Sequence, residues 1–296
     1  MYKILITGKN SYIGNEVAMW LNKNPENFLV EKTSVRNNKW ENMDFSQYDV
    51  VYHVAGIAHV DAKKSMESLY YEVNTELTIS IAKRAKEHGV KQFIFMSSMI
   101  VYHESKSLKS EVITKHTVPT PNGFYGNSKL KAEEALHRLE DEKFKVVILR
   151  PPMIYGPSSK GNFLRLVKLA SITPVFPEFH NKRSMLYIDN LCEFVKQIII
   201  REERGTFYPQ NRELADTVEI VKYFAKANNH RLYVWKWLKI FVYLGSPLIN
   251  SLNKMFATYY YDEKLSKVNF DYQVITQEES FGKIITSAKG GAKWRI

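Results

Sequence analysis

The chain has 296 residues, of which 45% are hydrophobic and 25% are charged. This length and composition suit one large α/β domain, or one domain with a smaller lobe, and exclude a chain dominated by disorder. The formal net charge is +11 at pH 7, but lysine and arginine are spread along the chain without a nucleic-acid-binding motif, so we expect no nucleic-acid partner.

The first half of the chain alternates short apolar runs with helical stretches. The predicted strands are Tyr2–Ile6, Phe28–Val30 with an extension toward Val35, Asp49–Ala55, Phe93–Met96 and Val146–Leu149. The predicted helices are Gly14–Leu21, a long one from about Met66 to His88, and Tyr125–Glu142. Apolar strands without polar alternation, separated by helices, indicate a parallel sheet covered on both faces. The predicted fold class is therefore α/β, a Rossmann-like doubly wound sheet.

After Pro151 the pattern becomes irregular and rich in proline and aromatic residues. A helix at Asn190–Ile200 and a short strand at Thr206–Tyr208 are predicted to rejoin the main sheet. We therefore assign residues 1–155, together with 189–210, to a nucleotide-binding domain. Residues 156–188 and 211–296 are assigned to a smaller, interleaved substrate lobe. A cleft between two such parts is a natural place for a substrate.

The sequence also indicates the cellular compartment in which we expect the protein. The N-terminus runs directly into the first predicted strand, without the basic and apolar regions of a signal peptide. The single cysteine, Cys192, excludes an internal disulfide, and its apolar neighbours predict a buried, inert thiol. The apolar stretch Trp235–Leu244 is interrupted by two lysines and is too short to span a bilayer. We therefore expect a cytoplasmic protein.

The segment Leu232–Phe256 combines apolar and basic residues. A weak association with a membrane surface, near a lipid-linked sugar pathway, is one interpretation of this composition. Ordinary packing within the substrate lobe is the interpretation that we prefer from the sequence.

A glycine-containing loop joins the first predicted strand to the first helix. Gly8 allows a sharp turn, Gly14 allows close packing of the helix on the strand, and the helix start offers free backbone N–H groups to a pyrophosphate. We predict that this loop binds a dinucleotide through Gly8, Lys9, Asn10, Ser11, Tyr12, Ile13 and Gly14.

A second pattern suits proton transfer. Tyr125 and Lys129 are four residues apart at the start of a helix, so both side chains project from one face. A phenol with a pKa of about 10 is a poor proton carrier near neutrality, and an ammonium group one turn away favours the phenolate. Ser97 and Ser98 end a buried strand, where ligands bind in parallel sheets.

Together these motifs resemble those of the extended short-chain dehydrogenases/reductases, also described as the NAD-dependent epimerase/dehydratase family. The glycine loop is similar to Thr-Gly-x-x-Gly-x-x-Gly, with Ser11 in place of the middle glycine. The segment 97–102 resembles Ser-Ser-x-x-Val-Tyr of that family. The resemblance implies that the catalytic residues are Ser98, Tyr125 and Lys129, with Ser98 beside the reacting oxygen and Lys129 also holding the cofactor ribose.

The resemblance implies further cofactor contacts. These are Asp44 and Phe45 beside the adenine, Ala55 and Gly56 after the third strand, Asn74, and Pro152, in addition to Tyr125 and Lys129. NADP is slightly favoured over NAD, because Glu31 lies inside the second strand and no acid stands at its tip. Arg36 and Lys9 are instead available for a 2′-phosphate. His53 and His59 have no third partner at metal spacing, so no metal site is predicted.

Residues 149–157 resemble the Arg-Pro-x-x-Val-Tyr-Gly-Pro stretch of sugar-nucleotide enzymes. The resemblance implies that Ser98, Asn162 and Arg183 bind the substrate, with Arg183 on its pyrophosphate. The implied substrate is a nucleotide-diphosphate sugar, such as a UDP-hexose derivative, in surface polysaccharide synthesis. Relatives suggest a homodimer.

Three functions remain open at this stage. A 4-keto reductase is slightly favoured by Lys9, Arg36 and the missing strand-end acid, while a UDP-sugar 4-epimerase acting on UDP-glucose or UDP-N-acetylglucosamine fits the motifs equally well. A 4,6-dehydratase is less supported, because Met99 and Ile100 follow Ser98 where such enzymes often carry Asp-Glu. A non-catalytic dinucleotide-binding regulator is the third alternative, and a pure binder has no need of a poised phenol.

Overall fold

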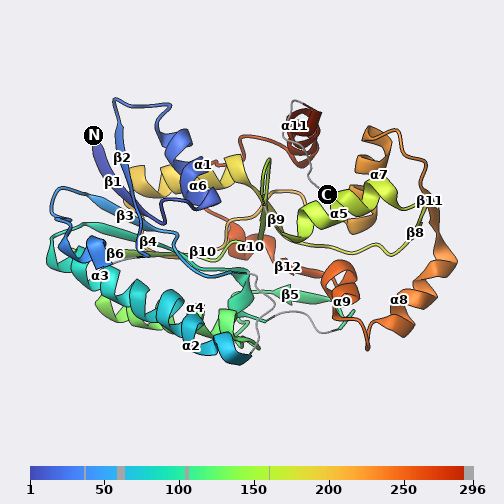
Figure 1. The fold of residues 1–296 in the computed structure, drawn as a ribbon, viewed down its shortest axis with the longest axis horizontal. Helices are drawn as coiled ribbons and strands as arrows, with labels where there is room; N and C mark the ends of the chain where they lie inside the picture. The colour runs from blue at the N-terminus through green and yellow to red at the C-terminus, as the bar shows by residue number, and fades with distance from the viewer. Residues whose placement is uncertain (37, 59–63, 104–106, 160, 290–296) are drawn as a thin grey trace.

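A six-stranded parallel sheet forms the centre of the protein. A computed structural model describes residues 1–36, 38–58, 64–103, 107–159 and 161–289. The strand order is β10-β6-β4-β3-β1-β2 (Figure 1). The strands are β1 (Tyr2–Thr7), β2 (Phe28–Thr33), β3 (Val50–His53), β4 (Gln92–Met96), β6 (Lys145–Leu149) and β10 (Gly205–Phe207). The predicted α/β fold class is confirmed.

The strand order reverses at β1. β1 pairs with β2 on one side and with β3 on the other, so that Thr7 stands opposite both Thr33 and His53. Connections from the carboxyl ends of these strands therefore leave in opposite directions, and in parallel sheets a position of this kind is where ligands usually bind. The glycine loop, Ala55 and Gly56 all follow strands at this edge.

Helices cover both faces of the sheet. α1 (Tyr12–Leu21) and α6 (Ile188–Ile200) lie on one face, and α2 (Glu67–Tyr71), α3 (Leu77–Glu87) and α4 (Phe124–Leu139) lie on the other (Figure 1). Successive side chains of a strand point to opposite faces, so each strand contributes side chains to the hydrophobic cores on both faces of the sheet. Ile4 and Ile94 belong to the core beneath α1 and α6, whereas Leu5 and Phe93 belong to the core beneath α3 and α4.

The long helix predicted from Met66 to His88 is not continuous. A π-helical turn at Glu72–Glu76 separates α2 from α3. Within it, Thr75 Oγ1 donates to the carbonyl oxygen of Ser128 at 2.7 Å, and Asn74 Nδ2 donates to Ser128 Oγ at 3.1 Å. The wider turn thus presents two polar side chains to α4, and such turns often occur at functional sites.

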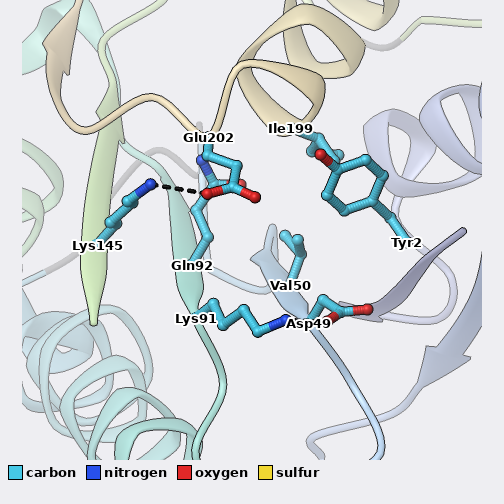
Figure 2. Close-up of a pocket in the computed structure, with 8 residues that line it drawn as sticks. All are labelled: Tyr2, Asp49, Val50, Lys91, Gln92, Lys145, Ile199 and Glu202. Atoms are coloured by element: carbon cyan, nitrogen blue, oxygen red, sulfur yellow. Dashed lines mark hydrogen bonds and ion pairs between the residues drawn. The ribbon is translucent and has the colours of Figure 1, made fainter. Parts of the chain in front are cut away.

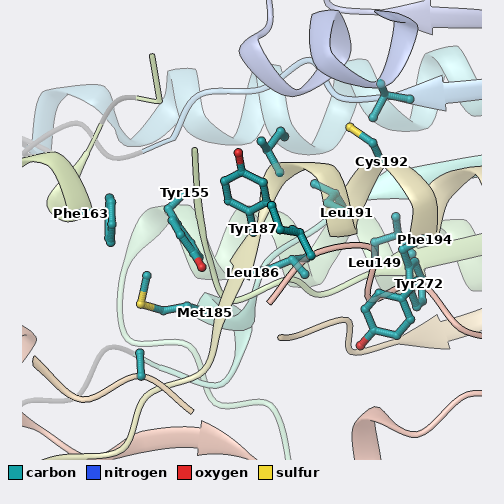
Figure 3. Packing of buried hydrophobic residues seen from close by; sticks show 14 of the residues in the cluster. Leu149, Tyr155, Phe163, Met185, Leu186, Tyr187, Leu191, Cys192, Phe194 and Tyr272 are labelled. Carbon is teal, nitrogen blue, oxygen red and sulfur yellow. The ribbon is translucent and has the colours of Figure 1, made fainter. Parts of the chain in front are cut away.

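The core beneath α6 is rich in aromatic side chains. Figure 3 shows Tyr155, Tyr187 and Phe194 packed in this cluster together with Cys192. Cys192 is buried, and burial raises the pKa of its thiol. The prediction that this cysteine is buried is therefore confirmed.

The remaining strands form three short parallel pairs, β7 with β9, β11 with β8 and β12 with β5. Their bounds are β5 (Glu111–Ile113), β7 (Met153–Tyr155), β8 (Val175–Pro177), β9 (Met185–Tyr187), β11 (Tyr233–Trp235) and β12 (Tyr259–Tyr261). The other helices are α5 (Asn162–Ile172), α7 (Thr217–Ala227), α8 (Lys239–Gly245), α9 (Asn250–Phe256), α10 (Glu263–Ser266) and α11 (Gln277–Lys289). Short 3₁₀ turns are η1 (Asn38–Asn42), η2 (Lys64–Met66), η4 (Met99–Val101) and η5 (Lys236–Leu238).

Two strand pairings place late segments of the chain beside earlier ones. β10 lies next to β6 in the main sheet, and β12 pairs with β5, which comes after β4 and the Ser97-Ser98 segment that follows it. The division into a nucleotide-binding domain and a substrate lobe, with a cleft between them, stays a prediction. Within the described ranges no helix is long and apolar enough to cross a membrane.

Candidate active site

The glycine loop fits tightly against the neighbouring strand. Gly8 has a φ of +101°, and a Cβ at this position would lie 3.1 Å from the Ala55 nitrogen. The amides of Gly8 and Lys9 donate to the Thr33 carbonyl oxygen at 2.9 and 3.0 Å, which fixes the loop to the end of β2. A Cβ on Gly14 would lie 3.0 Å from Val54 Cγ2, so this glycine permits close packing of α1. These are the roles that the sequence predicts for the two glycines.

Ser11 caps α1 where the family pattern has a glycine. Its φ is −68°, a value that any residue adopts, and its Oγ accepts from the Gly14 amide at 3.3 Å. The side chain therefore stabilises the helix start without straining the loop. The first amides of α1, including those of Tyr12 and Ile13, belong to the turn that has no intrahelical acceptors. Such amides can bind a pyrophosphate.

The Tyr12 side chain points toward Gly156. A Cβ on Gly156 would lie 2.6 Å from the Tyr12 hydroxyl oxygen. That hydroxyl is buried without a hydrogen-bond partner among the described residues, and burial raises its pKa. Asn10 and Lys9 are exposed beside it. An unsatisfied buried hydroxyl is costly, so this position has spare capacity for a polar ligand atom.

The tip of β2 offers basic rather than acidic groups. Glu31 lies inside β2, and its carboxylate accepts a short hydrogen bond from the Tyr48 hydroxyl. Arg36 is exposed, with its amide donating to Ser34 Oγ at 3.4 Å. Glu31 is thus engaged within the protein, while the exposed Arg36 is available to an anionic group.

Asp44 and Phe45 have different environments. The exposed Asp44 carboxylate accepts from the Ser46 amide at 2.9 Å, and hydrogen bonds from Ser46 and His88 lower the pKa of Asp44 to about 2. The Phe45 ring is fully buried, between Tyr48 and His88 in the core. Phe45 can therefore reach an adenine only through its backbone, and its side chain serves the core.

Asn74 holds the loop that contains Ala55 and Gly56. Its Oδ1 accepts from the Ile57 amide at 2.8 Å, and its Nδ2 donates to the Ile57 carbonyl oxygen at 3.0 Å. A Cβ on Gly56 would lie 2.9 Å from Asn74 Oδ1 and 3.3 Å from Lys129 Nζ. Only a glycine backbone can approach so closely here, which fits a loop over which a cofactor passes.

Ser98 and Tyr125 meet at the carboxyl end of β4. Their side chains are hydrogen-bonded, and Tyr125 also packs against Tyr70, with 6.3 Å between ring centroids. Burial raises the pKa of Tyr125 to about 12, although the hydrogen bond from Ser98 lowers it. Ser98 Oγ additionally accepts from the Ile100 amide at 3.3 Å, which fixes the serine at the start of η4.

Lys129 lies one turn along α4 from Tyr125, with its ammonium group at the end of β4. Its Nζ donates to the Met96 carbonyl oxygen at 2.8 Å and lies 4.5 Å from the centroid of the Phe95 ring. Burial lowers the pKa of Lys129 to about 7, while Glu133 raises it. The lysine therefore changes charge near neutrality, at a point between Gly56 and the serine-tyrosine pair.

A buried polar network behind Lys129 was not predicted from the sequence. Arg150 Nη2 lies 2.5 Å from Glu133 Oε2, and its Nε also donates to both carboxylate oxygens. Ser97 Oγ donates to the same carboxylate, and Arg150 Nη1 donates to the Tyr102 hydroxyl at 2.9 Å. Glu133 follows Lys129 at i+4, and this spacing was the available sequence signal.

Of the residues predicted to bind substrate, Ser98 lies just after β4, whereas Asn162 and Arg183 lie in the second half of the chain. Asn162 is exposed at the first position of α5. Pro152, which was predicted to contact the cofactor, is buried between β6 and β7. Arg183 Nη1 donates to the Lys254 carbonyl oxygen, and burial lowers the pKa of Arg183.

Two tyrosines of β12, which were not predicted from the sequence, connect Arg183 to the segment that follows β4. Arg183 forms a β-bridge with Tyr259, whose hydroxyl donates to the His103 carbonyl oxygen at 3.0 Å. Tyr261 packs edge-on against Tyr102 and donates to the Arg150 carbonyl oxygen at 2.8 Å. The weak resemblance of this region to the family was the only sequence signal.

His53 is engaged within the core. Its ring nitrogens contact Thr7 Oγ1 at 2.6 Å and Thr78 Oγ1 at 3.0 Å, and burial lowers its pKa to about 3. Across the part of the chain that the structure describes, no group of three or more His, Cys, Asp or Glu side chains could hold a metal ion. His59 lies outside the described residues, so the absence of a metal stays a prediction.

Two cavities lie away from these residues. Figure 2 shows a small pocket of about 20 Å³ lined by Tyr2, Val50, Gln92 and Lys145, each the first residue of its strand. It has room for about one water and lies at the opposite edge of the sheet from Ser98. A larger cavity of about 270 Å³ lies between β10 and residues 265–270.

Comparisons with known proteins identify the family and agree with the fold. The model of the NAD dependent epimerase/dehydratase family matches residues 4–207. The UDP-glucose 4-epimerase of Vibrio cholerae is 33% identical over 249 residues, which are 76% of this chain and 75% of that protein. The N-acetyl-alpha-D-glucosaminyl-diphospho-ditrans,octacis-undecaprenol 4-epimerase of Escherichia coli O157:H7 is 29% identical over 210 residues, 65% of this chain and 62% of that protein. The solved dTDP-4-dehydrorhamnose reductase of Clostridium acetobutylicum shares the fold, with a TM-score of 0.72 and 19% identity over 97% of this chain and 99% of that chain.

Proposed function

Because the chain belongs to the NAD dependent epimerase/dehydratase family, we propose that it is a 4-epimerase that transfers a hydride at C4 of a nucleotide-diphosphate sugar. The observation that carries this proposal is the hydrogen-bonded pair of Ser98 and Tyr125, with Lys129 one helical turn away. The sequence motifs alone slightly favour a reductase. Two relatives that align over most of this chain are 4-epimerases, and for this reason we prefer the epimerase reaction to the reductase reaction.

In the proposed reaction Tyr125 carries the proton of the C4 hydroxyl. The phenolate oxygen of Tyr125 accepts this proton as C4 is oxidised to a ketone, and returns it when C4 is reduced on the opposite face. Ser98 donates a hydrogen bond to the reacting oxygen, and the ammonium group of Lys129 stabilises the phenolate. A bound NAD(P) would supply a reversible hydride acceptor for C4, so that the overall reaction would consume no reductant.

The residues around the glycine loop fit a dinucleotide. The helix start after Gly8, the close approach of Gly56 and the unsatisfied Tyr12 hydroxyl leave room and hydrogen-bonding capacity for it. Arg36 and Lys9 favour NADP over NAD, as the sequence predicts. Equilibrium binding of both cofactors to the wild type and to Arg36→Leu tests this preference. Loss of NADP affinity alone supports it, and an equal loss for both cofactors contradicts it.

A 4-keto reductase is the second candidate. The same side chains serve it, and the basic groups at the tip of β2 suit NADPH, which a reductase consumes once per turnover. Co-purified cofactor and product analysis separate the two. Conversion of UDP-glucose or UDP-N-acetylglucosamine without added NADPH supports the epimerase. NADPH oxidation driven by a 4-keto sugar supports the reductase.

The group to which the sugar diphosphate is attached, a nucleotide or a lipid, can also be tested. Arg183 recognises a diphosphate in this proposal, and both a nucleotide and a polyprenyl lipid can carry one. Turnover assays with UDP-N-acetylglucosamine and with the polyprenyl-diphosphate-linked sugar distinguish them. A homodimer stays a prediction, which analytical ultracentrifugation checks.

The Tyr125→Phe variant tests the mechanism itself. Removal of the proton carrier is expected to lower kcat by about 10²- to 10⁴-fold with little change in KM. Unchanged turnover on every sugar substrate would falsify the proposed chemistry and would favour a dinucleotide-binding regulator.

A further inference from the structure

One segment of the molecule exposes an unusual number of large apolar side chains. It comprises residues 231–249, which include β11, η5 and α8, and we call it the aromatic arm. Figure 1 shows α8 at the far end of the molecule from β2. Trp235 is 42% exposed and both Trp237 and Phe241 are 57% exposed. The ordinary packing that we prefer from the sequence is therefore wrong for these side chains.

The exposed side chains form one continuous surface. The rings of Trp235 and Trp237 are stacked, with 5.7 Å between centroids, and Trp237 meets Phe241 edge-on at 5.7 Å. Tyr233 extends the row, 6.4 Å from Trp235. Further exposed apolar side chains of the arm are Ile240, Tyr243, Leu244, Leu248 and Ile249. Contiguous apolar surface of this kind marks a binding face.

The opposite side of the arm is anchored to the protein. Val242 of α8 is buried, and the Tyr243 ring lies 5.4 Å from that of Phe179. Gly245 lies against Leu252 of α9, since a Cβ there would be 2.8 Å from Leu252 Cδ1. The exposed face therefore belongs to a folded, amphipathic element.

The arm carries positive charge only. Residues 220–261 contain no aspartate or glutamate, and the arm itself contributes Arg231, Lys236 and Lys239. The acid that borders it is Glu178, whose amide donates to the Trp235 carbonyl oxygen and whose carboxylate lies 3.9 Å from His180 Nε2. The net charge of the whole chain has the same sign, +11. A negatively charged partner is thus favoured both locally and at long range.

From this composition we infer that the aromatic arm docks on the surface of an anionic phospholipid bilayer. Tryptophan and tyrosine side chains favour the headgroup region, where an apolar ring meets a polar boundary. Aliphatic and phenylalanine side chains enter the acyl boundary, while lysines among them pair with lipid phosphates. This inference does not depend on the reaction that the enzyme performs.

A second copy of the chain suits this surface poorly. A twofold symmetric contact places the same face against itself, so Lys236 and Lys239 would meet lysines and arginines across the contact with no acidic group of the arm between them. Like charges brought together in this way are destabilising. An anionic bilayer instead satisfies the apolar and the basic side chains together.

Docking at this place would present the substrate side of the protein to the membrane. The arm leads directly into α9, and the Lys254 carbonyl oxygen of α9 accepts from Arg183. Asn181 Nδ2 donates to the Met255 carbonyl oxygen at 3.0 Å in the same region. The docking element and the predicted diphosphate-binding residue therefore share one structural support.

Co-sedimentation of the full-length protein with vesicles tests this inference. Vesicles of phosphatidylglycerol mixed with phosphatidylcholine are expected to bind the wild type, and pure phosphatidylcholine vesicles to bind it much less. The double variant Lys236→Glu, Lys239→Glu is expected to lower the partition coefficient on anionic vesicles by at least about 30-fold, because each of the two lost lysines contributes about 1 kcal/mol. Trp237→Ala with Phe241→Ala is expected to lower binding to both kinds of vesicle.

Two exposed lysines of the main sheet region provide the matched control. Lys3→Glu with Lys143→Glu changes the net charge by the same amount and is expected to leave vesicle binding nearly unchanged. Circular dichroism and thermal unfolding check that all variants fold. Absence of wild-type binding to anionic vesicles, or an equal loss in the control variant, overturns the inference. A self-association that the Trp237→Ala, Phe241→Ala variant abolishes, without vesicle binding, would assign the face to a second copy instead.

Discussion

At the scale of single residues, Tyr125 and Lys129 show how one environment shifts two groups in opposite directions. Burial disfavours the charged form of each, so it raises the pKa of the phenol to about 12 and lowers that of the ammonium group to about 7. Ser98 opposes the first shift and Glu133 opposes the second. The pKa values of the two groups are therefore set by the hydrogen bond from Ser98 and by the charge of Glu133 as well as by burial.

The lowered pKa of Lys129 makes the stability of the protein depend on pH. The ordinary pKa of about 10.4 applies in the unfolded chain, so between pH 7 and about pH 10 the unfolded state binds more protons than the folded state. Stability is therefore expected to rise with pH across this window, by up to about 1.4 kcal/mol per pH unit from this group. Urea unfolding at several pH values, compared with Lys129→Met, measures the effect. Parallel pH profiles for the two proteins would contradict the assignment.

A comparison of Gly8 and Gly89 distinguishes the cost of a strained backbone from the cost of steric crowding. Both have a positive φ, +101° and +78°, but a Cβ on Gly8 meets Ala55 and Val54 whereas a Cβ on Gly89 meets nothing within 4 Å. We expect Gly89→Ala to cost about 1 kcal/mol and Gly8→Ala to cost about 2 kcal/mol or more. Denaturant unfolding measures both. Cofactor affinity should fall for Gly8→Ala alone, and equal effects of the two variants would argue against crowding at the loop.

At the scale of elements, α4 is attached to the sheet by charge as well as by packing. Glu133 of α4 and Arg150, which directly follows β6, form an ion pair with side chains 1% and 10% exposed. The pair also binds Ser97 and Tyr102, which lie on either side of Ser98, the proposed catalytic serine. This network holds the helix that carries Tyr125 and Lys129 against the strand that ends at Ser98.

Breaking the pair from one side leaves a buried charge without its partner. Glu133→Gln is therefore expected to destabilise the protein by about 3–5 kcal/mol, and Glu133→Gln with Arg150→Met by less than the sum of the two single changes. The more exposed pair Lys145–Glu202 is the control, with an expected cost of about 1 kcal/mol or less. Denaturant unfolding of the four proteins completes the cycle. Strict additivity would show that the two side chains act independently.

At the scale of the whole molecule, the return of β12 to β5 decides where Arg183, the proposed substrate-binding residue, lies. Tyr259 and Tyr261 connect the segment of Arg183 to His103 and Tyr102, which lie close in sequence to the end of β4. A long-range strand pairing thus gives the second half of the chain a fixed position relative to η4.

Arg183 and its neighbour Lys182 provide a test of this arrangement. Arg183 is held by the Lys254 carbonyl oxygen, whereas Lys182 is exposed. We expect Arg183→Met to raise KM for the diphosphate sugar by at least about tenfold, the value of one charged hydrogen bond, with a smaller effect on kcat. Lys182→Met should leave both nearly unchanged. Equal changes in the two variants would indicate a general charge effect rather than a specific contact.

The sequence by itself determined the features that depend on local geometry. Apolar strands, the turn at Gly8, the close packing of Gly14 and the Tyr125–Lys129 spacing follow from backbone rules that act over a few residues. The tertiary structure alone decided that Phe45 is buried, that a π-turn interrupts the helix around Asn74, and that β12 pairs with β5. It also decided that the aromatic arm faces outward. An amphipathic pattern specifies which face of a segment is apolar, but only the packing of distant segments, whose pairing is not encoded locally, determines what covers that face.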